Sequence, residues 1–155
     1  MAAPSAVQVF AKNINQFKLD DLTSANIRLA LVSSSATVDT TATGNTVWAN
    51  LSANEISGGT GYTSGGYSLT GSNAVSGTTG YYFTSGNASW TGSGGGISAW
   101  RYGVLYYSGT LWSLTNPLIA YFVGDSAPAD VPATAAGNIL QVTCPAAGWF
   151  TVLRT

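Results

Sequence analysis

Histidine is absent from this chain of 155 residues, which removes the most common general base, the histidine-dependent catalytic triads and the most common zinc ligand. Catalysis would therefore depend on carboxylates, of which the chain has six. Asp20 and Asp21 are adjacent, so on a strand they would face opposite sides, and no pair stands out as a glycosidase dyad. We predict no catalytic residue. An enzyme that acts on cell-wall sugars through Glu55 is the last of three hypotheses.

Charged side chains are scarce as well. They make up 7% of the residues, against about 25% in an ordinary soluble domain, and the net charge is −1. Binding to nucleic acid or to an anionic membrane needs clustered Lys and Arg, and the five basic residues are scattered. We therefore expect no nucleic-acid partner. A net charge near zero gives little protection against self-association, which favours a protein that works inside an assembly.

The chain has one cysteine and no long apolar run. The single Cys144 cannot form an intramolecular disulfide, and we expect it to be a small buried hydrophobic residue. No window of about 20 apolar residues exists, so we expect no membrane span. Residues 1–10 lack the basic start and apolar run of a secretory signal, which predicts synthesis in a cytoplasm.

Metal-binding patterns are equally sparse. The segment from Asp125 to Asp130 supplies only two carboxylates around Pro128, so we expect a solvated turn there in preference to a calcium site. The sequence therefore predicts no metal and no cofactor.

Apolar and aromatic residues, in contrast, are plentiful at 45% and 12%, enough for the core of one domain. Short apolar stretches alternate with Gly, Asn, Ser and Pro, a pattern typical of strands joined by turns. We expect strands at residues 7–11, 26–34, 67–70, 80–85, 88–91, 97–107, 117–124, 139–144 and 149–153. Residues 101–107 and 118–123 are apolar on both faces, which predicts central strands.

These strands predict an all-β fold, a single-domain β-sandwich or jelly roll, with at most one short helix near residues 46–56. We divide the chain into residues 1–25, an N-terminal arm or first strand, and residues 26–155, the β-sandwich domain. The first segment has two interpretations: it pairs with its own sheet, or it reaches a neighbouring subunit. In the second case its interface residues would be Val7, Val9, Phe10 and Phe17.

A glycine-dense stretch, residues 54–70, separates the mixed first part of the chain from the strand-rich remainder, and we call it the glycine-dense crossing. Its glycines indicate backbone angles or close approaches that a Cβ would forbid. No Lys, His or paired acid lies beside it, so we interpret it as a scaffold turn, in which Gly61 and Gly66 are needed for folding.

The five tryptophans suggest a different role, because an aromatic face can stack on the apolar C–H groups of a sugar. Packing in the core or at an interface is the more common use of such residues. Trp112 lies between two expected strands, and we expect it near the surface as a candidate contact for a ligand.

In their joint order, these features resemble a family of small tailed-bacteriophage virion proteins. The matching segments are an Ile-x-Leu-Ala-Leu strand with the serines after it (residues 27–35), Trp48, the first part of the glycine-dense crossing (residues 54–66), an Arg-Tyr-x-Val-x-Tyr strand (residues 101–106) and a Pro-Leu-Ile-x-Tyr strand (residues 117–121). The resemblance covers residues 27–153 and leaves out residues 1–26. One departure is an extra glycine, because Gly58 and Gly59 both precede Thr60.

The resemblance implies a β-sandwich structural protein of the virion, without catalytic residues. The first hypothesis is a capsid decoration (cement) protein that binds the major capsid protein or other virion proteins. It would be a homo-oligomer, with a trimer as the preferred state. The second is a module of the tail or of a head fibre that binds host-surface glycans. In either case the protein is made in the host cytoplasm and is located in the virion, with no nucleic acid and no membrane as a partner.

Overall fold

The computed structural model describes residues 5–14, 21, 26–41, 43–57, 61–71, 73–76, 80–125, 127 and 129–153. In these residues the chain forms twelve strands: β1 (Gln8–Val9), β2 (Ile27–Val32), β3 (Tyr67–Ser68), β4 (Asn73–Ser76), β5 (Gly80–Thr84), β6 (Ala88–Thr91), β7 (Tyr102–Tyr107), β8 (Thr110–Leu111), β9 (Leu114–Thr115), β10 (Leu118–Val123), β11 (Ile139–Val142) and β12 (Phe150–Leu153). Helical turns are short: α1 (Ala11–Ile14) and the 3-10 turns η2 (Trp48–Asn50) and η3 (Ser52–Asn54). The prediction of an all-β chain is confirmed.

The main sheet has five antiparallel strands in the order β1-β10-β7-β2-β3. Strand β7 lies at its centre between β10 and β2, as the double-sided apolar pattern predicts. Successive residues of a strand face opposite sides of a sheet, and in β2 the two sides are both buried. Leu29 and Leu31 belong to one hydrophobic cluster, whereas Ala30 and Val32 belong to another. The sheet is therefore covered on both faces.

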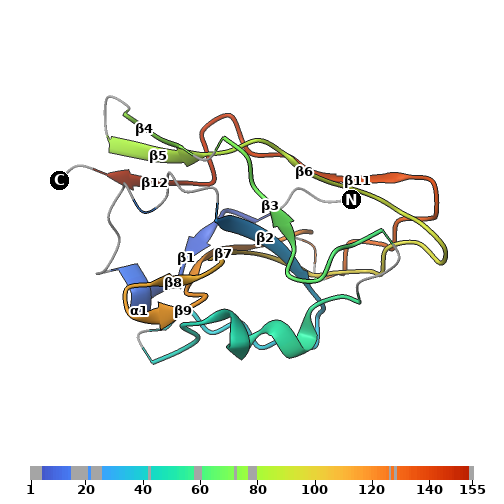
Figure 1. The fold of residues 1–155 in the computed structure, drawn as a ribbon, viewed down its shortest axis with the longest axis horizontal. Helices are drawn as coiled ribbons and strands as arrows, with labels where there is room; N and C mark the ends of the chain where they lie inside the picture. The colour runs from blue at the N-terminus through green and yellow to red at the C-terminus, as the bar shows by residue number, and fades with distance from the viewer. Residues whose placement is uncertain are drawn as a thin grey trace.

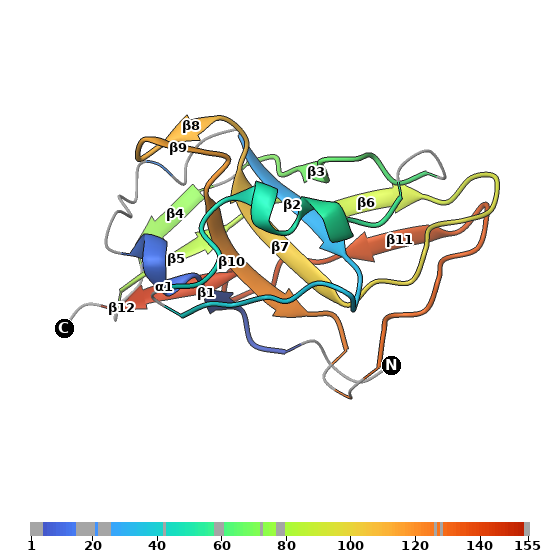
Figure 2. The same cartoon turned by 90° about the horizontal axis from the view of Figure 1, so that it is seen from below.

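Two different layers provide that cover (Figure 1). The small sheets β12-β5-β4 and β11-β6 lie over one face, and their Phe83, Trp90 and Phe150 join the cluster of Leu29. The segment with η2 and η3 lies over the other face, as Figure 2 shows from below. There the ring of Trp48 stacks on Tyr106, with centroids 4.8 Å apart and planes 5° apart.

The segment near residues 46–56, predicted as one short helix, forms the two 3-10 turns η2 and η3. The side chain of Asn50 accepts hydrogen bonds from the backbone N–H of Thr46 and of Val47, at 3.0 and 3.1 Å. Such side-chain bonds compete with α-helical pairing of the backbone. The prediction also omitted α1, β4 and the hairpin β8–β9.

The strand expected at residues 97–107 begins only at Tyr102. Before it, Ile97 and Trp100 form single bridges with Thr134 and Val131, which lie outside the main sheet.

The covering strands form a long two-stranded ribbon with one interruption. Strand β5 pairs with β12, and β6 with β11, in consecutive registers. Between these registers, seven residues separate Val142 from Phe150, whereas four separate Phe83 from Ala88. The β11–β12 side therefore has three more residues than the β5–β6 side, and residues 143–149 form a loop between the two paired segments. Cys144 lies in this loop and is half-exposed, so the expectation of a buried cysteine is wrong.

The N-terminal segment pairs with its own chain. Gln8 lies opposite Tyr121 of β10, and the Ser5 N–H donates to the carbonyl of Val123 at 2.9 Å. Phe10 is fully buried and its ring packs against Tyr121, with centroids 5.8 Å apart. In the described residues 5–10, the segment therefore pairs with the main sheet of its own chain.

Candidate functional site

The glycine-dense crossing is joined to the main sheet by a polar network around Glu55. The Oε1 atom of Glu55 accepts two hydrogen bonds of 2.7 Å, one from the Tyr62 hydroxyl and one from the Gly65 N–H. The same hydroxyl accepts from the Leu31 N–H of β2 at 3.0 Å. From β7, the Tyr106 hydroxyl donates to the Gly65 carbonyl at 2.6 Å. Two strands of the sheet thus hold one turn of the crossing.

The phenols in this network stay protonated over the usual pH range. Burial raises the pKa of Tyr106 to about 12, against an opposing effect of Arg28. Burial also raises the pKa of Tyr62, and the Glu55 carboxylate adds to that effect. Both hydroxyls therefore act as hydrogen-bond donors to oxygens of the fold. We interpret this arrangement as a structural latch.

Two glycines of the crossing are required by close contact. Gly61 and Gly66 have φ angles of 95° and 76°, a region that L-residues with a side chain rarely adopt. A Cβ at Gly61 would clash with the backbone of Thr91, and one at Gly66 with the backbone of Leu29. The stretch is a scaffold turn at both positions.

The other described carboxylates are also bonded within the fold. Asp130 accepts from Arg101 Nε at 2.7 Å and from Ser34 Oγ at 3.0 Å, and the Arg101 bond lowers its pKa. Asp39 accepts from the Thr41 N–H, which lowers its pKa.

The segment from Asp125 to Asp130 is not a solvated turn throughout. Asp125 is buried, with 6% of its surface exposed, and accepts from the Ala127 N–H at 3.0 Å. Among the residues that the structure describes, no group of three potential metal ligands comes together.

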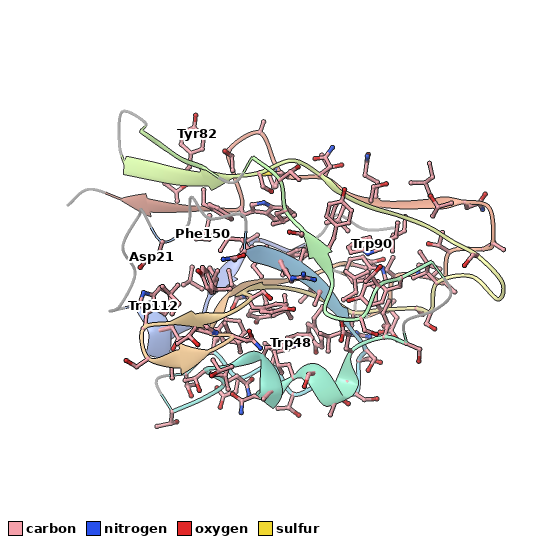
Figure 3. All side chains as sticks on the ribbon, viewed as in Figure 1. Asp21, Trp48, Tyr82, Trp90, Trp112 and Phe150 are labelled. Carbon is pink, nitrogen blue, oxygen red and sulfur yellow. The ribbon has the colours of Figure 1, made fainter. Side chains whose placement is uncertain are left out.

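Trp112, the predicted surface aromatic, lies at the tip of the hairpin β8–β9. Trp112 and Ser113 have φ angles of 54° and 60° at the two central positions of the turn, where Asn and Gly are the usual residues. The ring is half-buried, and its Nε1 donates to Asp21 Oδ2 at 2.8 Å. Figure 3 labels both side chains at this end of the molecule. The indole is therefore fixed at the surface by a carboxylate that lies 91 residues earlier in the chain.

The four predicted interface residues have different places. Phe10 is fully buried in the core of its own chain, and Val7 and Val9 are half-buried against the core. Phe17 lies outside the described residues. Of these four, Val7 and Val9 are the described side chains that keep some exposed surface for a neighbour.

A further feature is an apolar cavity of about 270 Å³ between β11 and the N-terminal end of the chain. Three aromatic rings line it: Trp100 meets Phe122 edge-on with centroids 6.3 Å apart, and Phe122 stacks on Trp149 at 5.8 Å. The cavity is completed by Ser5, Val7, Gly124, Val131, Leu140, Gln141, Val142, Thr143 and Pro145. The surplus loop at residues 143–149 forms part of its wall.

The two tryptophans of the cavity differ in their hydrogen bonding. Trp149 Nε1 donates to Ser85 Oγ at 2.8 Å. Trp100 is only 4% exposed, and its Nε1 has no hydrogen-bond partner among the residues that the structure describes. A buried N–H without an acceptor is uncommon.

No family model, curated protein or solved structure matches this chain. Within the described residues, no helix has the length and apolar character needed to cross a membrane.

Sequence reasoning missed the cavity because its lining comes from the N-terminal segment, the stretch before β7, the end of β10 and the region of β11. None of these segments is unusual by itself. The one local signal is the composition of residues 143–149, where Pro145 and Gly148 interrupt the pattern between two strands.

Proposed function

We propose that this protein is a structural component of a bacteriophage virion, a capsid decoration protein that binds the outer shell through protein–protein contacts. The segments that carry the resemblance have a common place in the fold. Residues 27–32 form β2, residues 102–106 lie in β7, and residues 118–121 lie in β10. The crossing is latched to β2 and β7. The motifs are therefore the framework of the fold, as expected when relatives share an architecture.

The single observation that carries the proposal is the use of the carboxylates. Chemistry without histidine would need free acidic groups, and the five described carboxylates each accept at least one hydrogen bond within the chain: Asp21, Asp39, Glu55, Asp125 and Asp130. This arrangement favours a scaffold over a catalyst. It also argues against a cell-wall hydrolase that uses Glu55, because Oε1 of that residue holds Tyr62 and Gly65.

A sandwich-like architecture suits such a role, with the main sheet on one side of the core and the ribbon of β5, β6, β11 and β12 on the other. We propose that the protein is a homo-oligomer, with a trimer preferred, and that its partner is the major capsid protein or another virion protein. It is made in the host cytoplasm and resides in the virion. Neither nucleic acid nor membrane is proposed as a partner.

The test is a density map of intact virions, together with binding of the purified protein to shells that lack it. We expect density on the outer face of the shell that repeats with the shell's symmetry, and saturable binding. Useful attachment needs a contact of more than about 1,000 Å². Density confined to the tail, or absence of the protein from purified particles, would refute the decoration role.

A deletion of the N-terminal segment is a poor test of attachment, because Phe10 and β1 belong to the core of the subunit. Substitutions at Val7 and Val9 are better, since both side chains are half-exposed. Val7→Thr and Val9→Thr keep the β-branched shape and remove apolar surface. If this segment contacts the shell, occupancy on the particles falls while the melting temperature of the free protein changes little.

The second candidate is a tail or head-fibre module that binds host glycans. One observation favours it: Trp112 occupies a left-handed backbone position, which costs a bulky residue about 1–2 kcal/mol and often marks a functional site. On a glycan array, Trp112→Ala should abolish binding, whereas Trp112→Phe should retain part of it because a ring remains. No binding by the wild-type protein to glycans or to host envelopes would reject this candidate.

A further inference from the structure

Strand β11 has one free edge. It pairs with β6 from Ile139 to Val142, and no other described strand pairs with it. Figure 2 shows β6 along one side of β11 and no labelled strand along the other. An open edge presents N–H and C=O groups that can pair with another extended chain, and proteins usually block such edges with charge, proline or a covering segment.

The residues of β11 give this edge none of those protections. The strand reads Ile-Leu-Gln-Val, without a charge or a proline. Ile139 has 66% of its surface exposed and is the one large hydrophobic residue that is exposed in the described part of the chain. An uncharged edge strand of this kind is a place where another extended chain can pair.

The direction of the free backbone groups follows from the bonds at either end of the strand. The Gly92 N–H donates to the carbonyl of Asn138, and the Cys144 N–H donates to Asn87 Oδ1. Backbone groups alternate in direction along an antiparallel strand. The N–H and C=O of Gln141 therefore point away from β6, toward the free edge.

The aromatic cavity lies beside the same strand, because Leu140, Gln141 and Val142 form part of its wall. An edge next to an apolar cavity is the arrangement that strand addition uses, with backbone bonds for affinity and a pocket for a side chain. The ring of Trp100 forms part of the cavity wall.

Charge and size restrict what this site accepts. None of the residues that line the cavity is charged. The neighbouring Arg101 and Asp130 are bonded to each other at 2.7 Å. A charged side chain would thus lose its hydration without gaining a counter-ion. The volume of about 270 Å³ is below the roughly 300–1,000 Å³ typical of drug-sized ligand sites, so it fits one or two apolar side chains.

We propose that the free edge of β11 and the cavity of Trp100 together bind an extended, uncharged segment of a partner protein. The segment adds as a strand to β11, and one apolar side chain enters the cavity beside the Trp100 ring. This site does not depend on the virion role, because it follows from the strand edge and the cavity alone.

The test uses purified full-length protein and a capped peptide of seven residues that alternates threonine and valine around a central leucine. Binding is measured by calorimetry, and the contact surface by amide chemical shifts. We expect the shifts to concentrate on residues 139–143 and on the Trp100 indole N–H. A peptide with lysine in place of the central leucine should bind at least tenfold more weakly.

Two substitutions separate the backbone edge from the cavity. Gln141→Pro removes an N–H that faces the free edge and leaves the pairing with β6, so affinity should fall at least tenfold. Trp100→Phe puts a smaller ring in the cavity wall and removes apolar contacts with the inserted side chain, so affinity should fall about fivefold. Trp90→Phe is the matched control, because Trp90 Nε1 is also buried without a partner but lies outside the cavity. It should bind like wild type.

Each other outcome overturns the proposal. Absence of binding at millimolar peptide, or equal affinity of wild type and Gln141→Pro, excludes strand addition. Equal losses for Trp100→Phe and Trp90→Phe show a general effect of packing and exclude the contact inside the cavity. If wild-type protein self-associates without peptide and Gln141→Pro is monomeric, the occupant is a second copy of this chain and the assignment to a different partner is wrong. A failure to find the protein in virions would leave all these measurements unchanged.

Discussion

The hydroxyl of Tyr62 offers the sharpest test of how the crossing is held on the sheet. In Tyr62→Phe, the Leu31 N–H loses its acceptor and the Glu55 carboxylate loses one donor. Tyr62 is 2% exposed, so water cannot easily replace the hydroxyl. The ring stays and keeps its contact with Trp90, at 5.5 Å between centroids. The substitution therefore removes the polar part of the latch alone.

The expected loss of stability can be worked out from these two bonds. A buried donor left without an acceptor costs about 1–3 kcal/mol, and a hydrogen bond to a charged group contributes about 1.5–3 kcal/mol. Because both bonds share one hydroxyl, and Glu55 retains the Gly65 N–H, we expect a total near 3 kcal/mol. For a domain of this size, that corresponds to a fall of about 6–12 °C in melting temperature.

The assay is urea unfolding followed by tryptophan fluorescence, at one fixed protein concentration. Tyr67→Phe is the matched control, since Tyr67 lies in the same crossing and contacts Trp90 through its ring, and its hydroxyl makes no hydrogen bond with the part of the chain that the structure describes. We expect that variant to stay within about 0.5 kcal/mol of wild type. If Tyr62→Phe loses no more than Tyr67→Phe, the latch does not stabilise the fold and the interpretation of the crossing is wrong.

Two other predictions concern the same region. Gly66→Val should prevent folding and assembly together, whereas Gly95→Ala, at a position with free space and no positive φ, should fold normally. A Gly66→Val variant that is folded by circular dichroism would contradict the account of the turn. Tyr106 has a pKa of about 12 in the fold against about 10 in the unfolded chain, so its contribution is complete below pH 10 and is lost as the pH rises through 12. Between pH 10 and 12, the free energy of unfolding should fall less steeply with pH in Tyr106→Phe than in wild type, by up to about 1.4 kcal/mol per pH unit.

Much of the main sheet could be predicted from sequence, because β2, β7 and β10 combine length with apolar residues on both faces. Such a run has few alternatives to a central strand. The segment near Trp48 was harder, since its apolar spacing fits a helix equally well. Its 3-10 turns depend on side-chain bonds of Asn50 and on stacking against Tyr106, a residue 58 positions away in the chain.

The candidate sites could be predicted only in part. A position for Trp112 near the surface follows from the strands on either side, but its bond to Asp21 depends on how the chain returns to that end of the molecule. The free edge of β11 could not be predicted, because edge and centre are properties of the strand order. The exposed Cys144 has the same origin, since the surplus of three residues exists only once β11 and β12 are in register with their partners.

The pairing of β1 with β10 has a consequence for the time course of synthesis. Gln8 and Tyr121 lie 113 residues apart, so at 5–20 residues per second a ribosome makes the partner of β1 roughly 6–23 s after β1 itself. During that interval Val9 and Phe10 have no strand to cover them. Burial of Phe10 and pairing of β1 are therefore late events, which follow the synthesis of β10.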